Sequence, residues 1–279
     1  MMKKMIKTLM ICCILMTLFG AELKAHASEP PTHFPLIQNG DPVPWKKAEQ
    51  LLPRGSIFTV IDKETGFYFK VQRRAGSSHA DVQPLSYGDT AVLKHLYNGK
   101  WSWRRRAILI PVNDQLIAAS MHGMPHGRGS LPNGFPGHFC IHFQGSRTHK
   151  KENMDPSHQL MVYKAAGKLE EYAANASPEQ LIVMFLAGLK QQDKAIVQHT
   201  LSSELQSSAM IRDYLLEIHA LHYELVKKET RYPPFVKTSV AAKVKMHRSD
   251  KPDIRGTLYF TLKRSSITSG WKITKISQK

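Results

Sequence analysis

The strictest pattern in this chain is an alternation of side-chain character close to its C-terminal end. Between residues 236 and 246 every second residue is apolar or small, and three lysines lie among the residues between them. The side chains of a strand point alternately to its two faces, so this segment predicts a strand with one buried and one solvated face. Segments 258–262 and 271–273 repeat the pattern. Together they predict an antiparallel sheet whose lysine-rich side faces the solvent.

Two predicted helices precede these strands. Ser177 is followed three residues later by Gln180, which is the form of a helix capping box, and an apolar face follows. A second helix is predicted over 204–218. This order predicts a separate α+β domain over 175–279, and it resembles the NTF2-like folds of exported wall proteins. The resemblance implies helices packed on a curved antiparallel sheet.

Strand signals dominate the preceding part of the chain. The predicted strands cover residues 57–61, 67–71, 107–112 and 116–121, and the first two form a hairpin. A short helix is predicted over 89–97. Asp155-Pro156 has the form of a helix start, and we expect that helix to reach about Ala174. These elements predict a mainly β domain over 55–174 with a trailing helix.

The first 27 residues have the three parts of a secretory signal peptide. Lys3, Lys4 and Lys7 precede an apolar stretch of 11 residues, and Ala25-His26-Ala27 forms a small-residue cleavage site. The apolar stretch is shorter than the ~20 residues that span a bilayer. We therefore expect a mature protein from about Ser28, with no membrane span, secreted or associated with the cell wall. Prolines over 28–54 predict an extended lead-in.

The formal net charge of the chain is +17. Such an excess attracts polyanions, and for an exported protein anionic wall polymers are the expected partners. The basic residues are scattered along the chain and form no compact basic motif. We therefore predict no nucleic-acid partner.

The residues best suited to take part in a reaction surround Cys140. This is the one cysteine expected to remain after Cys12 and Cys13 leave with the signal peptide. Segment 121–143 holds four histidines and five glycines and has no hydrophobic period. An imidazole can accept the proton of a thiol, and glycines let backbone N–H groups approach a developing oxyanion. This combination predicts thiol catalysis without a cofactor. It also predicts that the pKa of Cys140 lies below the ordinary thiol value of about 8.5.

Two motifs of this segment resemble the active-site region of the L,D-transpeptidases, cell-wall cross-linking enzymes with a YkuD-type domain. His122-Gly123 matches the first motif, and the run Gly137-His138-Phe139-Cys140-Ile141-His142 matches the second. The chain departs from the family at three positions, where Gly137 replaces Ser or Thr, Phe139 replaces Gly, and His142 replaces Arg. The resemblance implies a YkuD-like catalytic domain over 55–174 that transfers acyl groups of peptidoglycan stem peptides.

The resemblance also implies residue roles. Cys140 is the expected nucleophile, His122 its base, and His138 part of the wall of the site. His126 is a second candidate for the base. The expected substrate contacts are Gly123, Gly137, Phe139, His142, Arg147 in place of the missing arginine, and a stacking platform formed by Trp101 and Trp103.

Two other interpretations stay open. Alternate residues of a strand share a face, so His138 and His142 can join His79 and Asp81 as ligands of zinc in a peptidoglycan hydrolase. The histidines can also belong to a non-catalytic wall-binding protein. Metal content and thiol labelling distinguish the three.

Overall fold

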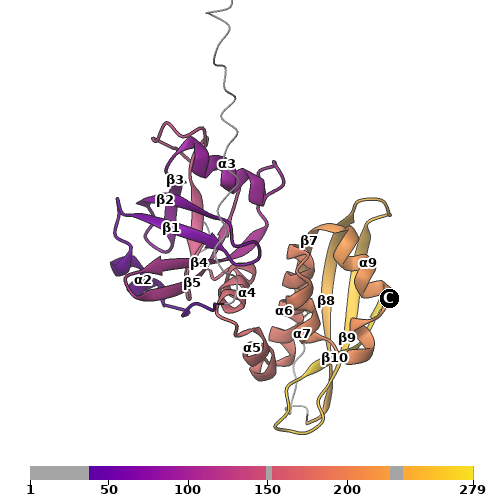
Figure 1. Ribbon diagram of the computed structural model, residues 1–279. Helices are drawn as coiled ribbons and strands as arrows, with labels where there is room; N and C mark the ends of the chain where they lie inside the picture. Colours follow the sequence, from indigo (N-terminus) through magenta and orange to yellow (C-terminus); the bar gives the residue numbers. More distant parts are fainter. Residues whose placement is uncertain (1–37, 149–152, 227–234, 279) are drawn as a thin grey trace, which may run out of the picture. The chain divides into compact units, whose positions relative to one another are not determined.

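The computed structural model describes residues 38–148, 153–226 and 235–278 (Figure 1). The predicted signal peptide, residues 1–27, lies outside the described residues. Inside the predicted proline-rich lead-in, the structure has a helix, α2 (Trp45–Leu51), and buries Val43, Trp45 and Leu52. No helix within the described ranges is long and apolar enough to cross a membrane.

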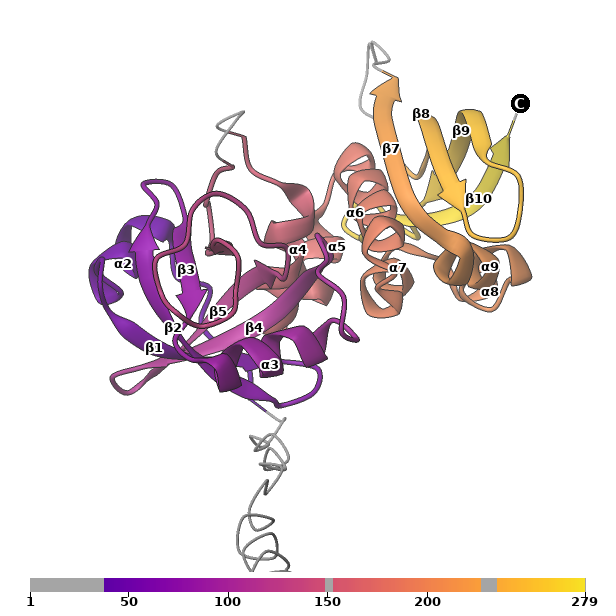
Figure 2. The ribbon, with the colours of Figure 1, turned by 90° about the horizontal axis from the view of Figure 1, so that it is seen from above.

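Six strands form a closed antiparallel barrel in the order β1-β2-β3-β6-β5-β4 (Figures 1 and 2). The strands are β1 (Ile57–Asp62), β2 (Tyr68–Ala75), β3 (Ala80–Pro84), β4 (Arg105–Val112), β5 (Gln115–His122) and β6 (Phe139–His142). The predicted hairpin is confirmed as β1 and β2, and the predicted strands 107–112 and 116–121 are confirmed within β4 and β5. The predicted helix at 89–97 is α3 (Tyr87–Leu96), which Ser86 caps.

Strands β3 and β6 were not predicted, and both carry residues of the candidate site. Strand β6 lies inside the glycine-rich segment and pairs with β3 on one side and β5 on the other. Asp81 is the partner of Cys140 across the first pair, and Ser120 is the partner of His142 across the second. This register places residues from distant parts of the sequence side by side.

The alternation along β6 divides its residues between the two faces of the barrel wall. Phe139 and Ile141 belong to the hydrophobic cluster that includes Val60, Phe69 and Ile110. Cys140 and His142 therefore point to the outer face. That outer face is covered, because both residues are almost fully buried.

A helical segment follows the barrel. It consists of α4 (Pro156–Ala165), α5 (Leu169–Asn175), α6 (Pro178–Gln191), α7 (Lys194–Thr200), α8 (Ser203–Gln206) and α9 (Ala209–Glu217). The predicted start at Asp155 and the capping box at Ser177 are confirmed. The predicted extension to Ala174 is wrong, since α4 ends before Gly167, whose φ is +68°. The predicted helix 204–218 is divided into α8 and α9.

Four strands form a second sheet in the order β10-β9-β8-β7 (Figure 2). They are β7 (Ile218–Val226), β8 (Lys237–Arg248), β9 (Ile254–Lys263) and β10 (Lys272–Gln278). The alternation that predicted β8 is confirmed: Val240, Ala242 and Val244 are buried and the intervening lysines are exposed. The sheet buries this face against α6, where Phe185 contacts Phe260 edge-on.

The predicted fold class, a mainly β YkuD-like domain followed by an NTF2-like α+β domain, is wrong. The structure has a closed six-stranded antiparallel barrel, a separate four-stranded sheet and, over the described residues, eight helices. The prediction assumed that residues 55–174 and residues 175–279 each form a hydrophobic core of their own. One buried cluster instead contains Leu109 and Ala118 of the barrel, residues of α4–α7, and Phe260 of the sheet.

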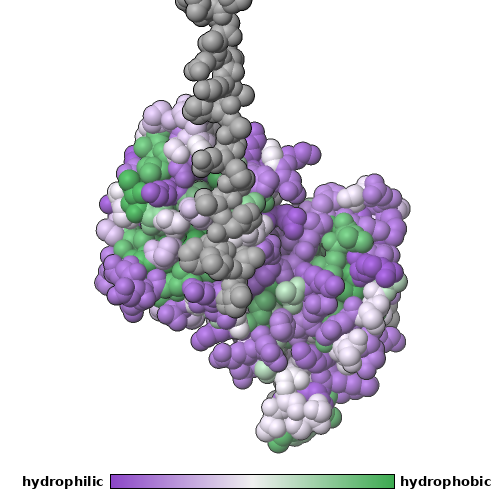
Figure 3. All heavy atoms as spheres, viewed as in Figure 1, coloured by the Kyte–Doolittle hydropathy of each residue, from purple (hydrophilic) through white to green (hydrophobic). Residues whose placement is uncertain are grey.

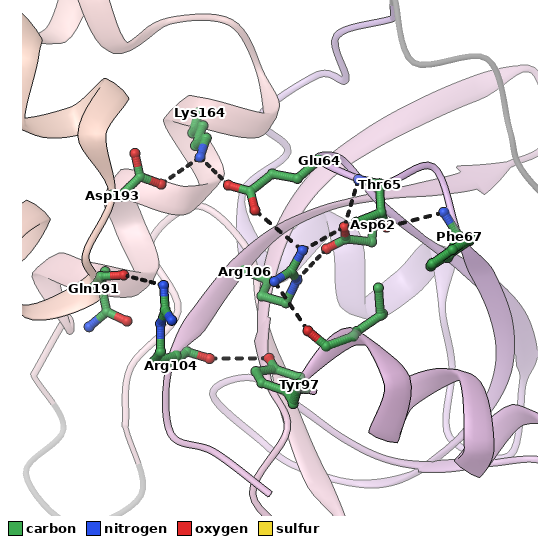
Figure 4. Close-up of polar contacts among 11 residues, drawn as sticks. Asp62, Glu64, Thr65, Phe67, Tyr97, Arg104, Arg106, Lys164, Gln191 and Asp193 are labelled. Carbon is green, nitrogen blue, oxygen red and sulfur yellow. Dashed lines mark hydrogen bonds and ion pairs between the residues drawn. The ribbon is translucent and has the colours of Figure 1, made fainter. Parts of the chain in front are cut away.

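A network of ion pairs joins the barrel to these helices (Figure 4). Arg106 of β4 donates to both carboxylate oxygens of the buried Asp62, at 2.6 and 2.8 Å. Lys164 of α4 donates to Glu64 and to Asp193, which caps α7. These contacts fix the position of the buried Asp62 carboxylate.

On the face seen in Figure 3, hydrophobic residues form separate patches among hydrophilic ones.

Candidate active site

The candidate site lies on the outer face of the barrel wall, where β3, β6 and β5 run side by side. Asp81, Cys140, Ser120 and His122 occupy this face, and each is no more than 5 % exposed. The loop between β5 and β6 and the first turn of α4 contribute further imidazoles. The site is therefore a polar cluster enclosed between the barrel and the segments that cover it.

The thiol of Cys140 contacts one imidazole directly. Its Sγ lies 3.2 Å from Nε2 of His126. The other ring nitrogen of His126, Nδ1, lies 3.1 Å from the carbonyl oxygen of Met124. A carbonyl only accepts, so Nδ1 carries the proton in the neutral ring and Nε2 presents its lone pair to the thiol. This is the arrangement of a nucleophile, a base and a group that orients the base.

Backbone pairing holds His126 at this position. The N–H of His126 donates to the carbonyl of His138, and the N–H of His138 donates to that of His126, both at 2.9 Å. Two glycines permit the close approach. A Cβ on Gly137, whose φ is +133°, would lie 2.5 Å from the carbonyl oxygen of His126, and one on Gly127 would lie 2.3 Å from the His138 ring.

Two more histidines have the same tautomer as His126. Nδ1 of His79 lies 2.7 Å from the carbonyl oxygen of Arg147, and Nδ1 of His138 lies 3.2 Å from that of Arg128. Their Nε2 atoms face Oδ1 of Asp81, at 3.2 and 3.8 Å. The same oxygen is 3.6 Å from Sγ of Cys140. The Nε2 atoms of both histidines and the thiol sulfur thus surround one carboxylate oxygen.

A stack of imidazoles completes the cluster. The rings of His79 and His142 are stacked at 4.6 Å, and those of His142 and His158 at 3.8 Å. His158 lies in the first turn of α4, and its Nδ1 is 2.9 Å from Oγ of Ser120. Burial, followed by the neighbouring His142 and then by the positive charge of Arg105, lowers the pKa of His158 well below its ordinary value.

His122, the base implied by the resemblance, does not contact the thiol as His126 does, although one of its ring nitrogens lies within 4.8 Å of Sγ of Cys140. Its ring centre is 5.3 Å from that of His126 and 4.6 Å from that of Trp103. Its Nδ1 accepts a hydrogen bond from the N–H of Met124 at 3.3 Å. Burial, with Arg105 nearby, lowers the pKa of His122 well below its ordinary value, so the ring is neutral near pH 7. His122 thus supports the turn that carries His126.

The resting state of Cys140 is a neutral thiol. Burial raises the pKa of Cys140 far above its ordinary value, and the neighbouring Asp81 carboxylate raises it further. The predicted lowering of this pKa is therefore wrong, because the sequence did not show that a carboxylate lies opposite the thiol. A proton must leave Cys140 during reaction, and His126 is the acceptor in contact with it.

The remaining predicted residues differ in their distance from the thiol. Trp103 contacts the rings of His122 and His126, whereas Trp101 packs edge-on against Phe135 at 5.1 Å. Arg147 reaches the cluster through its backbone carbonyl. Three other predicted contacts are packed within the fold. Phe139 lies in the barrel core, Gly123 packs against the Tyr97 ring, and Gly137 lies against the backbone of His126.

Sequence reasoning missed Ser120, His158 and Arg105. Ser120 and His122 are two residues apart, and their alternation along the predicted strand could have placed both on one face. Arg105 donates to Asp155 at 2.6 Å, which ties β4 to the start of α4. No sequence signal links His158 to the cluster, since its position depends on how α4 packs on the barrel.

Two hollows lie beside the segment Trp101–Arg105. The smaller, of about 340 Å³, has Trp103 and Met124 in its wall and so borders the residues that hold His126. The larger, of about 1010 Å³, is lined by six lysine and arginine side chains but only two carboxylates. Its lining includes Lys100, Arg104 and Lys194, for which no carboxylate partner lies within the described residues. Arg104 and Arg106, both in this lining, are drawn with their polar contacts in Figure 4.

No protein-family model matches this chain. A comparison with curated proteins likewise finds no match.

Proposed function

We propose that this chain is an exported cell-wall protein that transfers acyl groups of peptidoglycan stem peptides through a thioester at Cys140. The observation that carries the proposal is the 3.2 Å contact between Sγ of Cys140 and Nε2 of His126, with Nδ1 held by the Met124 carbonyl. Cell-wall peptide is the proposed substrate because of the motif resemblance, and the geometry supports the thiol chemistry.

In this reaction His126 acts as a general base. Its Nε2 takes the S–H proton as Sγ attacks the carbonyl carbon of the donor peptide, so the C–S bond forms as the S–H bond breaks. The protonated imidazole then gives its proton to the leaving amine as the peptide C–N bond breaks. In the second step His126 takes a proton from the acceptor amine as that amine attacks the thioester, the C–S bond breaks, and the imidazolium returns this proton to Sγ of Cys140. Water in place of the amine gives hydrolysis.

Substrate access is proposed through the hollow of about 340 Å³ beside Trp103 and Met124. Trp103 is 49 % exposed and its ring also contacts His126, so one side chain lies at both the surface and the base. An indole in this position can pack on a sugar or peptide segment. Cys140 itself is buried, so productive binding requires the segments that cover its sulfur to move.

Anionic wall polymers are proposed partners of the larger hollow. Arg106 and Lys164 are neutralised by Asp62, Glu64 and Asp193, as Figure 4 shows. The cations of Lys100, Arg104 and Lys194 remain for a ligand. These neighbouring positive charges repel one another. A negatively charged polymer in the hollow would offset that repulsion by its attraction to all three.

The proposal is tested by trapping the thioester. The purified chain is incubated with a muropeptide donor and examined by mass spectrometry for a covalent adduct on Cys140. We expect an adduct in the native chain, none in Cys140→Ala, and at least a tenfold slower appearance in His126→Gln. His95→Gln, an exposed residue of α3 that lines neither hollow, is the matched control and leaves the rate unchanged. A turnover that survives Cys140→Ala overturns the proposal.

A second candidate is the zinc-dependent peptidoglycan hydrolase with His79, Asp81, His138 and His142. The observation that favours it is the convergence of the His79 and His138 Nε2 atoms on Oδ1 of Asp81. That ligand set does not include Cys140, so the activity of the Cys140→Ala variant distinguishes the two candidates. A hydrolase keeps its activity in Cys140→Ala and loses it on treatment with a chelator.

A further inference from the structure

We propose that His79, Asp81 and Cys140 form a binding site for a divalent transition metal of the zinc class, and that the bound metal blocks the thiol. The regulatory half of this inference rests on the proposed function of Cys140 as the nucleophile. The binding half does not, and the two are tested separately below.

The distances support a common ligand sphere. Zinc bonds of about 2.0–2.3 Å in a tetrahedral arrangement place ligand atoms roughly 3.3–3.8 Å apart. Oδ1 of Asp81 lies 3.2 Å from Nε2 of His79 and 3.6 Å from Sγ of Cys140. Ring nitrogens of His79 and His142 and Sγ of Cys140 also lie within 4.8 Å of one another. Asp81 and Cys140 come from adjacent strands, and His79 directly precedes β3, which limits the movement of all three ligands.

The second ring nitrogen of His79 gives an independent indication. Histidine ligands in proteins usually donate their other N–H to a carbonyl or carboxylate, which fixes the tautomer. Nδ1 of His79 makes this bond to the Arg147 carbonyl at 2.7 Å, so Nε2 is the ring nitrogen that faces the Asp81 carboxylate, at 3.2 Å. A proton on Nε2 makes this contact an ion pair, and a metal ion that replaces the proton would bind both atoms.

The donor types select the metal. Thiolate sulfur, imidazole nitrogen and carboxylate oxygen are the ligands of zinc and its neighbours, whereas calcium and magnesium require oxygen alone. His142 and His138 are the nearest candidates for a fourth ligand, since one stacks on His79 and the other faces Asp81. On binding, the S–H bond of Cys140 breaks, its proton passes to solvent, and a sulfur–metal bond forms.

The consequence for catalysis is direct. Coordination to a metal cation withdraws electron density from the sulfur and lowers its nucleophilicity, and the sulfur no longer contacts His126 as a proton donor. A metal-loaded chain therefore has a less reactive nucleophile until the ion is removed. This couples acyl transfer to the metal concentration outside the cell.

Binding is measured on the full chain with Zn²⁺ alone by calorimetry and with Co²⁺ by absorption. We expect one ion per chain and a sulfur-to-cobalt charge-transfer band. The band should be absent in Cys140→Ser, and the affinity should fall at least tenfold in His79→Ala and in the isosteric Asp81→Asn. His222→Ala, an exposed residue of β7, is the control and keeps the native affinity. Circular dichroism verifies that each variant is folded.

Regulation is measured by the alkylation rate of Cys140. We expect saturating Zn²⁺ to slow alkylation at least tenfold and a chelator to restore the rate. Absence of binding at micromolar Zn²⁺, or equal binding by Cys140→Ser, overturns the metal site, and a thioester trapped on Cys140 would still support the proposed function. Tight binding without an effect on alkylation overturns the regulatory half.

Discussion

The backbones of His126 and His138 hydrogen-bond to each other in both directions, at 2.9 Å each. This pair closes the neck of the loop that leads from β5 to β6, and it sets the two imidazoles at a ring separation of 4.4 Å. One ring then contacts the thiol of Cys140 and the other faces Asp81. The neck therefore determines the geometry of the site more than the loop beyond it does.

Replacement of the glycine at this neck should disrupt the site. In Gly137→Ala the new Cβ would lie 2.5 Å from the His126 carbonyl at a φ of +133°. We expect a loss of about 1–3 kcal/mol in the free energy of unfolding, as for other strained backbone positions, and slower thioester formation. Chemical denaturation and adduct mass spectrometry measure the two effects.

The control for this change is Gly145→Ala. Gly145 also has a positive φ, of +74°, but its Cβ would meet nothing within 4 Å. This variant should cost about 1 kcal/mol of stability through backbone strain alone and leave thioester formation intact. Equal loss of activity in both variants would contradict the role of the neck.

Charge reversal on the second sheet should stabilise the chain. Lys263 of β9 is the partner of Lys237 on β8 and of Lys272 on β10. Like charges directly opposite each other are destabilising, by roughly 0.2–1 kcal/mol for each pair. We therefore expect Lys263→Glu to raise the free energy of unfolding, and added salt to reduce the difference from the native chain.

Lys243→Glu is the matched change with the opposite sign. Lys243 lies on the same face of the sheet but is the partner of Glu224 on β7. Reversal there creates a pair of carboxylates, so the free energy of unfolding should fall. If both variants shift stability in the same direction, net charge rather than cross-strand pairing explains the result.

Acid should weaken the ion-pair network of Figure 4 through Glu64. Partial burial raises the pKa of this carboxyl group, but the charges of Lys164 and Arg106 outweigh burial and hold the pKa below its ordinary value of 4.5. The stabilisation is thus present above pH 4.5 and is lost as the pH falls through the lowered pKa. Glu64→Gln should be less stable than the native chain near pH 7, and the gap should close in acid.

Thermal unfolding between pH 3 and pH 7 measures this gap. Asp114→Asn removes one negative charge from the exposed turn between β4 and β5 and serves as the control. A constant difference between Glu64→Gln and the native chain across this range would rule out the pH-dependent contribution.

Binding of polyanions should depend on the larger hollow. Lys100→Gln combined with Lys194→Gln removes two of its cations, and we expect the dissociation constant for inorganic polyphosphate to rise about tenfold. Lys237→Gln combined with Lys245→Gln removes the same charge from the second sheet and should have a smaller effect. Fluorescence anisotropy at fixed ionic strength compares them, and equal weakening would indicate attraction to net charge alone.

Sequence reasoning identified residues of the candidate site but not their geometry. The motif around Cys140 identified the thiol and four of the imidazoles near it. Local periodicity also found strands β4 and β5, whose hydrophobic runs are long. It could not give the register that sets Asp81 opposite Cys140, because β3 and β6 are short and lie 59 residues apart at this pair.

The predicted lowering of the Cys140 pKa and the predicted fold class were wrong for related reasons. Both depend on contacts between distant segments: Asp81 beside Cys140 in one case, and helices α4–α7 packed on barrel and sheet in the other. His158 likewise reaches the cluster only through the packing of α4. Patterns within a short window carry no information about such contacts.

Asp155 links the start of α4 to the barrel with one carboxylate. Its Oδ1 accepts the N–H of Ser157 as the helix cap, and its Oδ2 accepts from Arg105 of β4. His158 is in the same helical turn, stacked on His142. Local fraying of this turn would therefore separate the stacked rings without unfolding the barrel. Amide exchange of residues 157–159 should report directly on how often the buried cluster opens to water.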